Sequence, residues 1–77
     1  MAQIFYEYFK KELKEATVLV RINPENFAGL ELIVLANGQI KKTKRSFDET
    51  IYEDLEFDAF IKSSPLEFNL YLNGISS

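Results

Sequence analysis

Four cations stand close together in the middle of the sequence, at Lys41, Lys42, Lys44 and Arg45. Cations spaced along one strand can neutralise phosphate groups, which gives a salt-dependent affinity for nucleic acid without sequence preference. An aromatic side chain on an adjoining strand, such as Tyr71, would then stack on exposed bases. Lysines on an edge strand also prevent edge-to-edge aggregation, and we favour this structural role. Weak, non-specific nucleic-acid binding through this basic patch is the alternative.

Six carboxylates follow the basic run directly. They are Asp48, Glu49, Glu53, Asp54, Glu56 and Asp58. Carboxylate oxygens are ligands for Ca²⁺ or Mg²⁺, but this spacing lacks the central glycine and the terminal glutamate of an EF-hand loop. On a helix these carboxylates would point around the axis instead of converging on one ion. We therefore expect no metal site, and a solvated face that attracts a basic partner or the basic strand of a second copy.

The sequence contains no cysteine and no histidine. Their absence excludes the usual zinc, haem and iron–sulfur ligand sets, and the Ser-His-Asp and Cys-His catalytic arrangements. The three glycines form neither a P-loop nor a dinucleotide-binding pattern. We therefore expect no cofactor and no catalytic activity.

Length and composition indicate one folded domain over residues 1–77. Hydrophobic residues make up 47% of the chain, well above the range of disordered sequences, and a chain of this length provides only one core. The net charge of −3 argues against a dedicated nucleic-acid binder. The first residues lack the basic start and apolar run of a signal peptide, and no apolar run is long enough for a membrane helix. We expect a cytoplasmic protein without a membrane partner.

The spacing of apolar residues predicts the elements of the first half. A helix is predicted over residues 4–16, because Phe5, Phe9 and Leu13 share one helical stripe. The alternative is a strand, because the aromatic and β-branched residues at the start of this segment alternate with polar ones. Strands are predicted over residues 17–22, 30–35 and 39–46.

The second half adds a helix and a strand. The helix is predicted over residues 48–62, with Ser46 and Glu49 at the spacing of a capping box. The alternative is a partly extended segment, because Phe57 and Ile61 do not share the helical stripe of the other apolar residues. Residues 66–72 alternate between apolar and polar and are predicted to form a strand. The element order is then α-β-β-β-α-β. It predicts an α+β fold: a small two-layer domain with a mainly antiparallel sheet of about four strands and both helices on one face.

Asn37-Gly38 is the strongest short signal for a hairpin, because a type I′ turn needs two residues that tolerate positive φ. A two-residue loop pairs Leu35 with Ile40 and Glu31 with Lys44. The face away from the helices then carries an apolar cluster, which we expect to dock a second copy or another protein. Its candidate residues are Leu19, Ile33, Leu35, Ile40 and Tyr71. The alternatives are a helix that covers this face and a longer loop that shifts the register.

The order α-β-β-β-α resembles that of double-stranded RNA-binding domains. Those domains carry a basic cluster at the start of the second helix, where this sequence has Asp48, Glu49 and Glu53. The resemblance is confined to element order, and no family is assigned. The sequence as a whole favours a small protein-interaction module or accessory subunit that self-associates and has no catalytic activity of its own.

Overall fold

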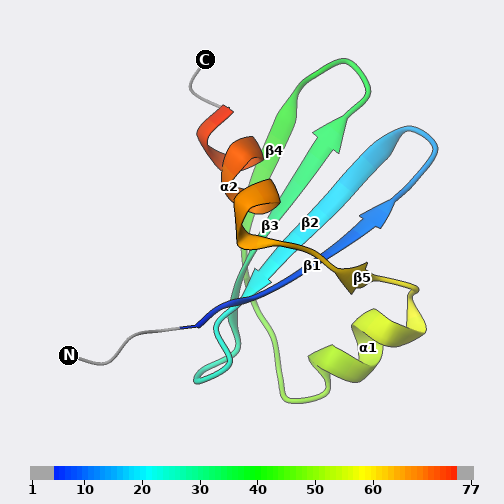
Figure 1. Cartoon of the computed structure of the whole chain (residues 1–77). Coiled ribbons are helices and arrows are strands. Elements are labelled where there is room, and N and C mark those ends of the chain that lie inside the picture. Colours follow the sequence, from blue (N-terminus) through cyan, green and yellow to red (C-terminus); the bar gives the residue numbers. More distant parts are fainter. Residues whose placement is uncertain (1–4, 75–77) are drawn as a thin grey trace.

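A computed structural model describes residues 5–74, which form one five-stranded antiparallel sheet and two helices (Figure 1). The strands are β1 (Glu7–Glu12), β2 (Ala16–Ile22), β3 (Ala28–Leu35), β4 (Ile40–Ser46) and β5 (Ile61–Lys62), and the helices are α1 (Ile51–Phe57) and α2 (Pro65–Gly74). The strands lie in the order β4-β3-β2-β1-β5, so β4 and β5 form the edges. No helix within the described residues is long and apolar enough to cross a membrane. The α+β class is confirmed, but the element order is β-β-β-β-α-β-α.

The predicted N-terminal helix is wrong, because β1 occupies the centre of residues 4–16. Phe9 is buried opposite Val20 of β2, whereas Phe5 and Leu13 of the supposed helical stripe are exposed. Aromatic residues favour strands, and β2 supplies hydrogen-bonding partners for the backbone of this segment. Because the first described element is a strand, the order also departs from that of double-stranded RNA-binding domains.

The strands predicted over residues 17–22, 30–35 and 39–46 are confirmed as β2, β3 and β4. The loop that joins β3 to β4 has three residues, 36–38, because Leu35 and Gln39 are hydrogen-bonded across it. The Gly38 amide donates to the Leu35 carbonyl (2.9 Å), and the Leu35 amide donates to the Gln39 carbonyl (2.8 Å). Gly38 has a φ of 92°, the left-handed conformation that closes such a loop. The predicted two-residue turn is therefore wrong. The extra loop residue shifts the register by one, so Ile40 pairs with Val34 instead of Leu35.

α1 is shorter than the helix predicted over residues 48–62. The predicted capping box is wrong, because Ser46 is the last residue of β4 and no side chain caps the start of α1. Instead, the Asp48 carboxylate accepts hydrogen bonds from the amide and the hydroxyl of Thr50, the residue directly before α1. At the other end Ala59 adopts a left-handed φ of 67°, which ends the helix and turns the chain toward β5.

The strand predicted over residues 66–72 is instead the helix α2. The hydroxyl oxygen of Ser64 accepts a hydrogen bond from the Glu67 amide (3.1 Å), and Pro65 occupies the first helical position, where its missing amide costs nothing. Phe68 is fully buried, whereas the apolar residues two positions before and after it are exposed. The alternating pattern therefore did not correspond to one buried strand face.

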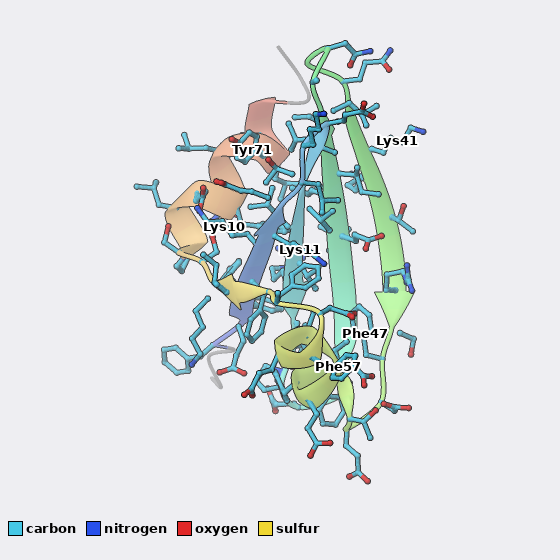
Figure 2. All side chains as sticks on the ribbon, turned by 90° about the vertical axis from the view of Figure 1, so that its right-hand side faces the viewer. Lys10, Lys11, Lys41, Phe47, Phe57 and Tyr71 are labelled. Atoms are coloured by element: carbon cyan, nitrogen blue, oxygen red, sulfur yellow. The ribbon has the colours of Figure 1, made fainter. Side chains whose placement is uncertain are left out.

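The two helices lie on opposite faces of the sheet, not on one face as predicted. Phe9 and Val20 point to one face and pack with Leu55 of α1. Leu19 points to the other face and packs with Phe68 of α2. Figure 2 shows α1 across the lower end of the sheet and α2 at its left side. The sheet is thus a middle layer between two helices, because successive strand residues alternate between faces.

Candidate functional site

Each helix is short, so each covers only one end of its face of the sheet. α1 packs over the end where β2 finishes, where its core cluster includes Ile22. α2 packs over the other end of the opposite face, near the turn between β3 and β4, where Val34 and Ile40 lie against its cluster. Two half-faces therefore have no helix above them. They lie diagonally across the sheet from each other and differ in chemistry.

The first of these, here called the apolar half-face, lies on the α1 side and consists of Val18, Ile33 and Leu35. Val18 is directly beside Ile33 in the sheet, and all three side chains are only half-buried. Val18 packs against the α1-side core cluster, whereas Ile33 and Leu35 belong to neither cluster. Two cations border this surface in the sheet register: Lys11 next to Val18 and Lys41 next to Ile33. In Figure 2 Lys41 lies toward the end of the sheet away from α1.

The predicted docking cluster is divided between the two faces, which corrects that prediction. Ile33 and Leu35 lie in the apolar half-face, whereas Leu19, Ile40 and Tyr71 lie on the α2 side. Leu19 has no exposed surface (0%), and both Ile40 and Tyr71 pack against its cluster. The three-residue loop moved Ile40 to the opposite face, and Tyr71 belongs to a helix instead of a strand.

The second half-face, here called the basic groove, lies on the α2 side at the end of the sheet that α2 leaves uncovered. It is a hollow of about 360 Å³, and its lining includes Tyr6, Arg21, Leu30, Lys42 and Lys44. The register aligns Arg21, Leu30 and Lys44 across β2, β3 and β4. No aspartate or glutamate is among the described residues that line it. A chain with a net charge of −3 thus carries a groove whose charged side chains are all positive.

Arg21 is the most enclosed cation of this groove. Its guanidinium carbon lies 4.5 Å from the centre of the Tyr6 ring and 5.6 Å from that of Phe68, so the two rings hold it through cation–π contacts. Across residues 5–74 no carboxylate forms an ion pair with Arg21, Lys42 or Lys44. These three cations are therefore available to an external anion.

Only part of the predicted basic patch contributes to this groove. β4 is an edge strand, as the interpretation of its lysines as edge protection requires. Lys42 and Lys44 line the groove, whereas Lys41 alternates to the other face. Arg45 also lines the groove, although the register pairs it with Gly29 on the α1 side of the sheet, and it forms an ion pair with Glu31 (Nη1 to Oε1, 3.4 Å). The expected pairing of Glu31 with Lys44 is wrong, because the register is shifted by one residue.

The sequence interpretation missed Tyr6 and Arg21 and placed Tyr71 beside the basic strand, although it lies on α2. Tyr8 pairs with Arg21 in the sheet, and its ring lies 6.5 Å from that of Tyr6. The alternation of Tyr6 and Tyr8 at the start of β1 was the available signal. It was obscured because the segment was assigned to a helix.

A separate polar cluster joins α2 to β1. Lys10 Nζ donates to one carboxylate oxygen of Glu67 (3.0 Å), and the Ser63 hydroxyl donates to the other (2.7 Å). The hydrogen bond from Ser63, followed by that from Lys10, holds the pKa of Glu67 below its usual value. The hydrogen bond to Glu67 raises the pKa of Lys10. Both shifts favour the charged pair, so this cluster attaches the helix to the sheet.

A cavity of about 370 Å³ lies between α1, β1 and β5, with Glu7, Tyr52, Glu56 and Lys62 in its lining. Burial is the main cause of a raised pKa for Tyr52, and the charge of Glu7 acts in the same direction. The Tyr52 hydroxyl is buried without a hydrogen-bond partner among the described residues. Burial thus makes this phenol harder to ionise than an exposed tyrosine. Within residues 5–74 no three acidic side chains are grouped so that they could hold a metal ion.

Comparison with known proteins gives this chain no family. No protein-family model matches it, and neither the curated proteins nor the solved structures contain a match.

Proposed function

We propose that this protein is a small interaction module that self-associates through the apolar half-face and has no catalytic activity of its own. The observation that carries this proposal is the position of Ile33 and Leu35. Both are half-buried on the surface of a central strand, and no helix covers them. An apolar sheet surface of this kind gains free energy when a partner removes it from water.

A second copy is the partner that fits the charges. Lys11 and Lys41 border the apolar half-face. The outer side of α1 carries the opposite charge, with Glu53 and Glu56 exposed, and beside them Phe57 is 91% exposed. Each copy therefore carries both an apolar surface with a basic border and a helix with an apolar side chain and an acidic border. Opposite charges in this arrangement favour association and fix its orientation.

A two-fold axis across the strands satisfies both surfaces at once. It would place α1 of each copy on the apolar half-face of the other, because α1 occupies one end of the face and the apolar half-face occupies the other. Such an interface is self-complementary, as in most homodimers. Phe57 would then pack on Ile33 and Leu35, with Lys41 next to the α1 carboxylates.

Sedimentation equilibrium of the full chain at several concentrations tests this proposal. We expect a monomer–dimer equilibrium that shifts toward the monomer as salt is added, because salt screens the paired charges. Ile33→Asp should abolish the dimer, and Lys41→Glu should weaken it while the far-ultraviolet circular dichroism stays unchanged. Lys41 is exposed, so its variant keeps the test valid if Ile33→Asp fails to fold.

Leu70→Asp is the matched control. Leu70 is 64% exposed on α2, away from the proposed interface, and its substitution should leave the dimer intact. A monomer at every concentration would overturn the proposal and leave the apolar half-face to a different protein. A dimer that is lost in Leu70→Asp and retained in Lys41→Glu would place the contact on α2 instead.

A further inference from the structure

We infer that the basic groove binds nucleotide phosphates, with Tyr6 as a stacking surface for the base. This inference is independent of the proposed self-association, because the groove and the apolar half-face lie on opposite faces of the sheet. It rests on three cations that form no ion pair within residues 5–74, on the ring beside them and on the size of the hollow.

The three cations are spaced for more than one phosphate. Lys42 and Lys44 are two positions apart on β4, which separates their Cα atoms by about 7 Å. Lys44 and Arg21 lie in the same row of the sheet with Leu30 between them, roughly 10 Å apart. A ligand with two or three successive phosphates, or a short stretch of nucleic-acid backbone, can contact all three cations. A single carboxylate can contact only one or two.

Arg21 is held in place before any ligand arrives. The rings of Tyr6 and Phe68 flank its guanidinium, and Phe68 is completely buried (0% exposed). A guanidinium fixed in this way loses little conformational freedom when it binds a phosphate, and its planar group of donors suits phosphate oxygens. Arg21 has no carboxylate partner within the described chain, so no internal ion pair has to be broken.

Tyr6 selects an aromatic ligand over a simple anion. Its side chain lines the groove and is 36% exposed. Leu30 lies between the cations at the base of the groove, with 9% of its surface exposed. A hollow of about 360 Å³ has room for one nucleotide, and stacking on tyrosine accepts any base. An acidic peptide would satisfy the cations but would not stack on the part of the Tyr6 ring that Arg21 leaves exposed, so we favour a nucleotide.

The test uses the full-length protein with three ligands: a fluorescent oligothymidylate, adenosine monophosphate and inorganic pyrophosphate. Anisotropy reports the oligonucleotide, and ¹H–¹⁵N spectra report the two small ligands through the amides of residues 21, 42 and 44. Three phosphate contacts predict a loss of oligonucleotide affinity of about 20-fold between about 50 and 200 mM salt. Lys42→Glu should weaken binding about tenfold or more, because a charge-assisted hydrogen bond is lost.

Lys41→Glu is the matched control, because it makes the same charge change at the adjacent position on the opposite face. Its effect on oligonucleotide affinity should be within about twofold after correction for net charge. Tyr6→Ala should lower affinity for the oligonucleotide and for adenosine monophosphate at least about fivefold, whereas Tyr6→Phe should retain binding because stacking needs only the ring.

The relative affinities of the three ligands and of the variants decide whether the groove binds nucleotides. Binding of the oligonucleotide alone identifies a single-stranded nucleic acid as the ligand, and equally tight binding of adenosine monophosphate identifies a free nucleotide. Pyrophosphate that binds as tightly as both, with no effect of Tyr6→Ala, would overturn the role of the base. Equal losses in Lys41→Glu and Lys42→Glu, or no binding of any ligand at low salt, would remove the groove as a nucleotide site.

Discussion

Lys41 and Lys42 are consecutive residues of β4, yet they lie on opposite faces of the sheet, beside Ile33 and Leu32 of β3 respectively. The three-residue loop that contains Gly38 fixes this assignment, because it sets the register of the hairpin. One edge strand therefore contributes to two surfaces of different chemistry. It borders the apolar half-face on one side and the basic groove on the other.

The two lysines should separate the two proposed activities. Lys41→Glu should shift the monomer–dimer equilibrium toward the monomer and leave oligonucleotide affinity nearly unchanged, whereas Lys42→Glu should do the reverse. The reason is that each substitution changes the charge of only one face. Sedimentation equilibrium and anisotropy on the same two protein samples measure both quantities. If both variants shift the monomer–dimer equilibrium equally, the dimer interface is not specific to the Lys41 face of β4. If both lower oligonucleotide affinity equally, the binding site is not specific to the Lys42 face.

Phe68 should be among the most important residues for stability. It fills the space between α2 and the sheet, so Phe68→Ala should lower the free energy of unfolding by about 3–5 kcal/mol. Phe57→Ala makes the same chemical change at an exposed position and should cost no more than about 0.5 kcal/mol. Urea unfolding followed by circular dichroism at low protein concentration measures both. Phe68→Leu replaces Phe68→Ala if the latter does not fold, and equal costs at positions 57 and 68 would contradict the packing of α2.

The pair between Lys10 and Glu67 predicts a loss of stability in acid. Hydrogen bonds from Ser63 and Lys10 lower the pKa of Glu67 in the folded state. The folded state therefore binds a proton less readily than the unfolded chain, and stability falls as the pH drops below about 4.5. Glu67→Gln removes this carboxylate. The difference in melting temperature between wild type and Glu67→Gln should be largest near neutral pH and should shrink in acid.

At alkaline pH the stability that this pair contributes is lost as the pH rises, not as it falls. The pKa of Lys10 is raised by Glu67, so the contribution of its charge is complete at neutral pH and is lost only as the pH rises through that raised pKa. Glu25→Gln, at an exposed loop position outside this cluster, is the control. A constant difference between Glu67→Gln and wild type at all pH values would show that the ion pair does not contribute to folding.

Much of the sheet was accessible from the sequence. β2 and β3 are rich in β-branched and apolar residues over lengths typical of strands, and no helical spacing competes with that pattern. Asn37 and Gly38 marked the reversal between β3 and β4 correctly. The length of the loop could not be predicted, because Gly38 is equally suited to the left-handed position of a two-residue or a three-residue turn. The one additional loop residue placed Ile40 on the opposite face of the sheet and divided the expected docking cluster.

The ends of the chain show where local pattern is insufficient. The segment around Phe9 has both a helical stripe and an alternating one, and pairing with β2 selected the strand. Around Phe68 the alternation favoured a strand, but Ser64 and Pro65 start a helix there. In both segments the competing local preferences differ by less than the free energy of packing against the sheet.

The sequence by itself determined the class of fold, the strands β2, β3 and β4, and the presence of a basic strand in an acidic chain. Only the tertiary structure decided that the helices lie on opposite faces, and that Tyr6 and Arg21 join Lys42 and Lys44 in one groove. The physical reason is that local spacing sets which residues share a face of a strand. Pairing between strands and burial by helices then decide which face remains open.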